Sequence, residues 1–271
     1  MQPNNNKQQV QHLFGRAAAD YAASGIHAQG YSLNRLLELT QPQPDWHVLD
    51  VATGAGHTAL TFTPHVAQVV ASDITAEMLA EAARLAQERG FTNFTTETAD
   101  AESLPFDDAT FDLVTCRLAA HHFPNLAQFV AEAARVLRPG GLLAVVDNVV
   151  PGSRLRGKKA RIEQEAGEYI NAYEKLRDPS HGRCLSLDEW IDLYREAGFA
   201  ITHQETADMW LDFDAYVHRM RVSPVNRTRL RAMLLQAPQR AAAFLTLQVA
   251  GDRITFRFTE AIILGRLGTR D

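Results

Sequence analysis

Residues 48–56 read VLDVATGAG, and this stretch decides the fold. Residues 48–51 form a short, largely apolar run of the kind that parallel sheets bury on both faces. The chain then turns through 53–56, TGAG, and enters the helical pattern of residues 57–62. Two glycines so close together indicate a turn with unusual backbone angles, or a ligand that lies against the main chain. A strand, a glycine turn and a helix in this order are typical of a nucleotide-type site.

The composition is that of an ordinary globular protein, with 271 residues, 46% hydrophobic and 22% charged. This length permits one large or two small domains. The net charge of -5 argues against a nucleic-acid partner. Cys116 and Cys184 are far apart and form no CxxC pair, which excludes a disulfide framework and a cysteine zinc site. The sequence shows no apolar run of membrane-spanning length and no signal-peptide core, so a cytoplasmic location is the default.

Strands and helices alternate through the first 150 residues. Further apolar, β-branched runs predict strands at 67–73, 94–98, 111–116 and 142–150. Helical patterns separate them at 75–90 and 129–137, and two more helices precede them, from about residue 10 and at 31–39. Such alternation predicts an α/β fold with a doubly wound parallel sheet.

Polar side chains follow several of these predicted strands. Asp50, Asp73, Asp100 and Arg117 all fall at or just past a strand end. Asp73 lies 23 positions after Asp50 (73 − 50), close to the spacing at which an acidic residue meets ribose hydroxyls in nucleotide-binding units. Because ligands of parallel sheets bind at the carboxyl ends of the strands, these side chains predict one site at that edge.

The alternation breaks after Val150. Residues 151–184 and 208–244 read as mainly helical insertions, on either side of a helix at 186–197 and a strand near 199–206. Ser186 and Glu189 have the spacing of a capping box at the start of that helix.

The order of motifs resembles class I S-adenosylmethionine-dependent methyltransferases, in particular the bacterial group near the ubiquinone/menaquinone C-methyltransferases and the YcgJ-type proteins. The matching stretches are VLDVATGAGHTAL, VVASDITAEML, ADAESLPF, FDLVTCRLAAHHF and RVLRPGG, over roughly residues 45–150, with RDPSH and SLDEW in the second half. The resemblance implies a single methyltransferase domain with N-terminal helices at 1–44, a cofactor-binding core at 45–150 and cap insertions at 151–184 and 208–244. It also implies a Rossmann-like, seven-stranded sheet whose last strand, 254–264, is antiparallel.

The same resemblance assigns the cofactor, S-adenosylmethionine, to named residues. The turn would surround its methionine part, Asp73 would hold both ribose hydroxyls, and Asp100 would take the adenine amino group. Arg117 would offer its carbonyl near the ammonium end, and Phe14 and Tyr21 would close the site. The full expected cofactor-binding set is Phe14, Tyr21, Asp50, Thr53, Gly54, Gly56, Asp73, Ile74, Met78, Asp100, Ala101 and Arg117.

Alternatives to these cofactor assignments stay open at the level of single residues. The turn would suit NAD only weakly, because the third glycine of G-x-G-x-x-G is absent and the carboxylate of Asp50 would repel a pyrophosphate. Asp73 could cap the following helix, and Asp100 could form a turn.

The acceptor side is less defined. His121 or His122 is the candidate general base, since an imidazole titrates near neutral pH, and the alternative for both is a structural role. The pair has no nameable third and fourth ligand, so no metal site is expected. His181 and Arg183 are the candidate substrate residues, with a helix stop and turn as the alternative.

The sequence therefore predicts methyl transfer to a small organic acceptor, by O- or C-methylation of a quinone- or phenol-like molecule. The alternatives are a protein of this fold that binds the cofactor without methyl transfer, or an RNA methyltransferase. The expected partners are the small-molecule acceptor and a second copy of the chain in a homodimer, with no nucleic acid and no membrane span.

Overall fold

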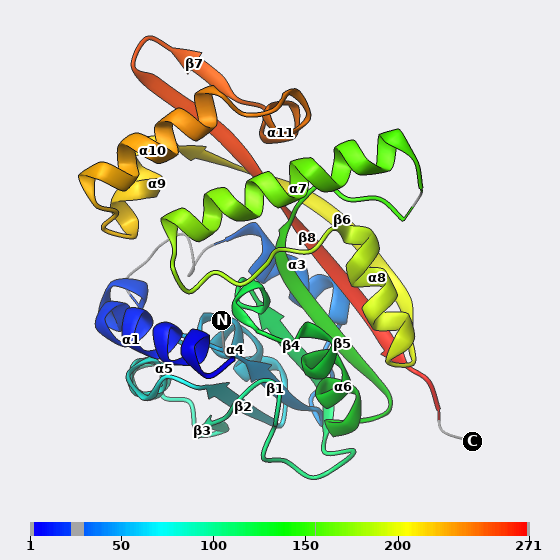
Figure 1. Ribbon diagram of the computed structural model, residues 1–271. Coiled ribbons are helices and arrows are strands. Elements are labelled where there is room, and N and C mark those ends of the chain that lie inside the picture. The colour runs from blue at the N-terminus through cyan, green and yellow to red at the C-terminus, as the bar shows by residue number, and fades with distance from the viewer. Residues whose placement is uncertain (1–2, 23–29, 155, 270–271) are drawn as a thin grey trace. The chain divides into compact units, whose positions relative to one another are not determined.

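The computed structural model describes residues 3–22, 30–154 and 156–269. The helices and strands follow one another along the chain as shown in Figure 1. Those of the first half are α1 (Pro3–Ala22), α3 (Tyr31–Thr40), β1 (His47–Val51), α4 (His57–Phe62), η1 (Thr63–His65), β2 (Gln68–Asp73), α5 (Ala76–Glu88), β3 (Phe94–Thr98), β4 (Phe111–Arg117), η2 (Ala120–His122), α6 (Leu126–Val136) and β5 (Leu137–Val149). Those of the second half are α7 (Lys158–Arg177), α8 (Leu187–Glu196), β6 (Phe199–Asp212), α9 (Phe213–Arg219), α10 (Pro224–Leu235), α11 (Gln239–Leu245), β7 (Gln248–Ala250) and β8 (Arg253–Leu267).

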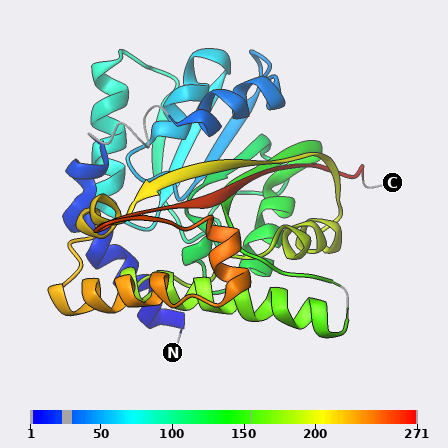
Figure 2. The same cartoon turned by 90° about the horizontal axis from the view of Figure 1, so that it is seen from above.

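The strands form one sheet in the order β3-β2-β1-β4-β5-β8-β6, with β7 paired to β8. The pairs from β3 to β5 are parallel, and the C-terminal strands are antiparallel. Figure 2 shows the long strands β6 and β8 side by side. The order reverses between β1 and β4, which is where doubly wound sheets bind ligands. The predicted Rossmann-like fold class is confirmed.

The sheet has one strand more than the seven expected. β7 forms a short antiparallel hairpin with β8 through Gly251, whose φ of 60° is the left-handed conformation that a tight hairpin turn requires. Two predicted strand bounds also shift. β5 begins at Leu137 because that residue pairs with Phe111 across a bulge, and β6 continues to Asp212.

The chain forms two compact units. The first unit contains residues 1–147, 193–205 and 262–271, and the second contains 148–192 and 206–261. In the first unit, buried Val48, Val69, Leu113 and Ala144 from four parallel strands form the centre of an apolar cluster. Helix α1 of this unit packs beside α5 (Figure 1).

The second unit has its own apolar core. It is built from α7, α9, α10, α11 and parts of the C-terminal strands, with Tyr173, Phe213, Leu230 and Phe256 all buried in it. Figure 2 shows α10 and α11 packed along α7. The predicted capping box is present at the start of α8. Glu189 Oε2 accepts from the Ser186 amide at 2.8 Å, and Ser186 Oγ accepts from the Glu189 amide at 3.3 Å. In the described part of the chain, no helix combines the length and the apolar character needed to cross a membrane.

Candidate functional site

A cavity opens at the carboxyl ends of the parallel strands of the first unit. It contains about 1040 Å³ of space, open solvent included. Its wall comes from the loops that follow β1, β2, β3 and β4, together with one face of α1. The lining residues are Lys7, Val10, Phe14, Ala52, Thr53, Gly54, Ala55, His57, Thr58, Asp73, Ile74, Thr75, Met78, Ala99, Asp100, Ala101, Glu102, Arg117, Leu118, Ala119, His122, Phe123 and Pro124.

The glycine turn after β1 adopts the unusual backbone angles that its sequence predicts. Gly54 has φ 54° and Gly56 has φ 85°, and even Ala52 lies in the left-handed region at φ 52°. A side chain costs about 1–2 kcal/mol in that conformation. Gly54 lines the cavity, whereas Gly56 lies behind the wall as the first residue before α4. The turn therefore brings bare main chain to the cavity surface.

Asp50 lies behind this turn and does not line the cavity, although the resemblance assigned it to the cofactor. Its side chain is buried, and Oδ2 accepts from Thr53 Oγ1 at 2.6 Å and from the Ala59 amide at 3.2 Å. Oδ1 accepts from Thr115 Oγ1 at 2.6 Å. Burial raises the pKa of Asp50 to about 6, against the lowering effect of these hydrogen bonds. The carboxylate thus holds the turn, α4 and β4 together from inside.

The raised pKa of Asp50 predicts a pH dependence of stability. A carboxyl group whose folded-state pKa exceeds its unfolded value of 3.8 stabilises the fold fully below that value, and loses this contribution as pH rises through about 6. The shift corresponds to about 3 kcal/mol, an order-of-magnitude figure. We expect wild type to lose stability relative to Asp50→Asn as the pH rises from 4 to 6.5, because Asn does not titrate. Urea denaturation measures the free energy of unfolding of both proteins. A difference that stays constant over this range would contradict the assignment.

Asp73, at the end of β2, joins two loops at the cavity surface. Its Oδ2 accepts from the Gly54 amide at 2.9 Å, and its Oδ1 accepts from the Thr75 amide at 2.8 Å. Burial raises the pKa of Asp73, and the two amide hydrogen bonds oppose that effect. The bond to Thr75 means that Asp73 does serve the start of α5, while Thr75 at the N-cap position makes no side-chain cap bond. Asp73 thus serves the start of α5 and also lines the cavity, and its ligand role stays a prediction.

Asp100 and Glu102, after β3, meet a lysine that sequence reasoning missed. Lys7 Nζ of α1 lies 2.6 Å from Asp100 Oδ2 and 2.6 Å from Glu102 Oε2. Burial alone would lower the pKa of Lys7, but the two carboxylates outweigh it and raise that pKa. Asp100 Oδ1 also accepts from the Glu102 amide at 3.0 Å, so the predicted turn is present as well. No local pattern connects Lys7 to residues more than 90 positions away.

Helix α1 is attached to the rim of the cavity at two further loops. Gln11 Nε2 donates to the Ile74 carbonyl at 2.9 Å, and Asn6 Nδ2 donates to the His122 carbonyl at 2.8 Å. The ring of Phe14 meets the ring of His122 edge-on, with centroids 5.1 Å apart. The side chain of Tyr21 lies outside those that the structure describes. Helix α1 therefore covers one side of the cavity, as the assignment of Phe14 requires.

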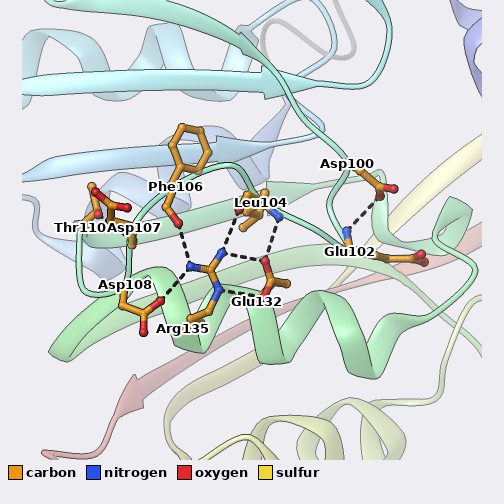
Figure 3. Close-up of polar contacts among 9 residues, drawn as sticks. All are labelled: Asp100, Glu102, Leu104, Phe106, Asp107, Asp108, Thr110, Glu132 and Arg135. Atoms are coloured by element: carbon orange, nitrogen blue, oxygen red, sulfur yellow. Dashed lines mark hydrogen bonds and ion pairs between the residues drawn. The ribbon is translucent and has the colours of Figure 1, made fainter.

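The loop that carries Asp100 and Ala101 is fastened to α6 by one arginine (Figure 3). Arg135 donates to the carbonyls of Phe106 and Leu104 at 2.7 and 2.8 Å. Glu132 pairs with Arg135 and also accepts from the Leu104 amide at 2.8 Å. These charge-assisted bonds add to the burial of Leu104 and the edge-on contact of Phe106 with Phe111 in fixing the path of the loop. Arg135 is the first residue of the stretch RVLRPGG that carries the resemblance, whereas Glu132 lies outside the quoted stretches.

His121 and His122, after β4, differ in their surroundings. His122 lines the cavity, whereas His121 is not among the lining residues. The rings of His121 and His122 pack against each other, with their centroids 4.3 Å apart. His121 Nδ1 is 2.6 Å from Asp147 Oδ1, a partner in β5 that the sequence did not indicate. Arg117 lines the cavity and donates from Nε to Ser32 Oγ at 2.9 Å.

The candidate substrate residues lie in the second unit. His181 is buried, and its Nε2 is 2.9 Å from Asn171 Oδ1. Arg183 forms an ion pair with Glu189. These contacts support the alternative interpretation of this segment as a helix stop and turn. The substrate role of His181 and Arg183 stays a prediction.

The chemistry of the cavity wall suits a cationic adenosyl cofactor. Desolvation raises the pKa of the buried Cys116 thiol, and the nearby carboxylates of Asp147, Asp50 and Asp73 raise it further. The cavity wall itself carries three carboxylates, Asp73, Asp100 and Glu102, against two cationic side chains, Lys7 and Arg117. A sulfonium and an ammonium group are attracted to such a surplus of carboxylates, whereas a pyrophosphate is repelled. Ile74 and Met78 add apolar wall beside Asp73 for an aromatic base. The residues present therefore fit S-adenosylmethionine better than NAD.

Comparison with known proteins gives the same result. Residues 49–145 match the model of a methyltransferase domain. The chain is 32% identical over 254 residues to the uncharacterized methyltransferase YcgJ of Bacillus subtilis, covering 93% of this chain and 96% of the relative. The crystal structure of that YcgJ protein superposes with a TM-score of 0.81 at 31% identity, over 89% of this chain and 99% of the other.

Two further proteins are similar over most of their length. A crystal structure from Bacillus halodurans has a TM-score of 0.80 at 34% identity, over 89% of this chain and 100% of that one. Nocamycin O-methyltransferase of Saccharothrix syringae is 28% identical over 273 residues, covering 94% of this chain and 97% of the relative. Together with the cavity, these similarities show that the chain belongs to the S-adenosylmethionine-dependent methyltransferases and is an enzyme with S-adenosylmethionine as its cofactor.

Proposed function

We propose that the protein transfers the methyl group of S-adenosylmethionine to a small organic acceptor, at oxygen or at carbon of a phenol- or quinone-like molecule. The observation that carries this proposal is the cavity with acidic side chains behind and within its wall. The O-methyltransferase named among the relatives supports a small acceptor. Since S-adenosylmethionine is already activated, the chain's own contribution is to align the two reactants, which supplies up to about 7–11 kcal/mol.

We assign the cofactor to the residues that line this cavity. Asp73 accepts from the ribose hydroxyls, Ile74 and Met78 face the adenine, and Asp100 with Ala101 binds its polar edge. Thr53, Gly54 and Arg117 bind the methionine part through the main chain. Asp50 and Gly56 act from behind by holding the turn in place. The homodimer and the roles of the two insertions stay predictions.

Calorimetry with S-adenosylhomocysteine tests this function first. We expect binding at micromolar concentration to the wild-type chain. A second assay measures the S-adenosylhomocysteine formed from S-adenosylmethionine with a panel of phenols and quinols. Absence of binding at high micromolar concentration would end the proposal. Binding without turnover over the panel would favour a cofactor-binding protein without methyl transfer.

Removal of the Lys7 ammonium is expected to speed cofactor release. Lys7 joins α1 to Asp100 and Glu102 through two charge-assisted bonds, and the loss of such bonds costs about 1.5–3 kcal/mol where they are partly buried. We expect Lys7→Ala to raise the dissociation rate of S-adenosylhomocysteine by about tenfold in stopped-flow measurements. The wild-type rate should rise with salt and the variant rate should not, because salt screens the partly exposed pairs of Lys7 with Asp100 and Glu102, which the variant lacks. Lys159→Ala, which removes an exposed lysine of the second unit, is the matched control. If S-adenosylhomocysteine dissociates from Lys7→Ala as slowly as from this control, the link from Lys7 to Asp100 and Glu102 does not retain the cofactor.

A further inference from the structure

His121 and Asp147 form a buried pair that the cofactor assignments do not use. Asp147 is 2% exposed and lies near the carboxyl end of β5. Its Oδ1 is 2.6 Å from His121 Nδ1, and its Oδ2 accepts from the His121 amide at 2.7 Å. Both oxygens therefore meet the same residue, which fixes the imidazole in position and in orientation.

The backbone around the pair is held by the sheet. Arg117 pairs with Val146 at the end of β4, and the Leu118 amide donates to the Val146 carbonyl at 2.7 Å. The short helix η2 (Ala120–His122) then turns back, so that His121 meets the residue that follows Val146. The geometry of the pair is thus a consequence of the β4–β5 register rather than of a flexible surface contact.

The bonding determines which nitrogen of His121 is basic. In the tautomer in which Nδ1 donates to the Asp147 carboxylate, the basic lone pair lies on Nε2. A carboxylate in this position also stabilises the imidazolium that forms when Nε2 takes up a proton. A histidine held only for packing does not need a buried carboxylate at both its ring and its amide.

The pair lies next to the cofactor cavity. The ring of His121 packs against the ring of His122 with centroids 4.3 Å apart, and His122 lines the cavity beside Phe14. The charge of Asp147 acts at this edge of the sheet, where it contributes to the raised pKa of the Cys116 thiol. Asp147 and His122 are titratable groups that contact His121.

We propose that His121, positioned by Asp147, is the proton acceptor for an acceptor molecule whose reacting group is a weakly acidic hydroxyl, a phenol or an enol. This inference rests on the proposed methyl transfer and narrows its substrate class. A lone pair of the hydroxyl oxygen forms the bond to the methyl carbon, and the carbon–sulfur bond breaks with its electron pair going to sulfur. The hydroxyl proton passes to Nε2 of His121. The positive charge lost at sulfur reappears on the imidazolium, where the Asp147 carboxylate stabilises it. A thioether or a tertiary amine has no proton to lose on methylation, so such acceptors do not need a base.

Kinetics with paired phenols tests the role of His121. Each weakly acidic phenol of the panel is matched with its nitro-substituted counterpart, which is largely ionised at neutral pH and needs no base. We expect His121→Gln to lower kcat by about 10²-fold or more on the weakly acidic phenol, the usual contribution of a general base, and to leave kcat on the nitrophenol within a few-fold. Asp147→Asn should show the same contrast. His65→Gln, which removes an exposed histidine, is the control.

Nuclear magnetic resonance tests the pair without any acceptor. Long-range nitrogen–proton spectra of wild type, assigned with the His121→Gln, His122→Gln and His65→Gln variants, should show His121 with its hydrogen on Nδ1. In Asp147→Asn that tautomer should be lost, or the pKa of His121 should fall by at least one unit. Hydrogen on Nε2 in wild type, or a spectrum that Asp147→Asn leaves unchanged, would overturn the proposal.

The outcomes separate this inference from the proposed function. If S-adenosylhomocysteine does not bind to wild type, the proposed function itself fails. The other case is that S-adenosylhomocysteine binds to wild type, His121→Gln and Asp147→Asn alike. If His121→Gln then lowers kcat equally on the weakly acidic phenol and on its nitro-substituted counterpart, only the role of His121 is overturned. Cofactor binding without methylation of any phenol in the panel would overturn the substrate class.

Discussion

Asp73→Ala is expected to weaken the binding of S-adenosylhomocysteine by at least tenfold. Two effects add up in this variant. The carboxylate that we propose as the acceptor for the ribose hydroxyls is lost, and the Gly54 and Thr75 amides lose their acceptor. A hydrogen bond to a charged group contributes about 1.5–3 kcal/mol, and each 1.4 kcal/mol is about a factor of ten in affinity. Isothermal calorimetry at neutral pH measures the change directly.

A ligand without ribose hydroxyls separates the two effects. If Asp73 binds the ribose, the 2′,3′-dideoxy analogue of S-adenosylhomocysteine should lose less affinity than S-adenosylhomocysteine itself on going from wild type to Asp73→Ala, because only the effect on the loops remains. An equal loss for both ligands would show that Asp73 only holds the loops and that the ribose assignment is wrong. Asp107→Ala removes an exposed carboxylate of the same unit and should leave both affinities unchanged.

Gly56→Ala is expected to lower the free energy of unfolding by about 2–5 kcal/mol. Gly56 has φ 85°, where a side chain costs about 1–2 kcal/mol. A Cβ at this position would also lie 2.8 Å from Ala82 Cβ and 3.3 Å from Ala82 Cα in α5, and overpacking of this kind costs about 1–3 kcal/mol. Urea denaturation of the ligand-free chain measures the sum.

Gly54→Ala is the matched control for this prediction. Gly54 also has a left-handed backbone, at φ 54°, but a Cβ there meets nothing within 4 Å. We therefore expect Gly54→Ala to cost only the conformational part, about 1–2 kcal/mol. Equal destabilisation by the two substitutions would mean that the contact with Ala82 contributes nothing.

The sequence predicts the fold well because its signals are local. The apolar runs at β1, β2, β4 and β5 and the helical patterns between them alternate in a way that few other folds allow. The missed strand, β7, is only three residues long, and its one signal is the Gly251–Asp252 turn before an alternating segment. The sequence predicts that the strand beginning near residue 199 ends near residue 206, whereas β6 continues to Asp212. The residues of β6 from 206 onward belong to the second unit.

The candidate site is predicted only in part, for a physical reason. Residues at strand ends, such as Asp73 and Asp100, can be placed from the sequence because the topology brings all carboxyl ends to one edge. Lys7, Arg135 and Asp147 act through partners that are 26 or more positions away, as in the pairs Lys7–Asp100, Arg135–Asp108 and His121–Asp147. Asp50 shows a different limit of the sequence. It lies just before the glycine turn, but hydrogen bonds from Thr53 and Thr115 turn its side chain away from the cavity.

The inward position of Asp50 bears on how turnover ends. A carboxylate that is screened from water by the turn attracts any cation in the cavity more strongly than an exposed one would, since little solvent lies between them. Methyl transfer converts a sulfonium into a neutral thioether, so the chemical step itself abolishes part of that attraction. We therefore expect Asp50→Asn to weaken the binding of S-adenosylmethionine more than the binding of S-adenosylhomocysteine.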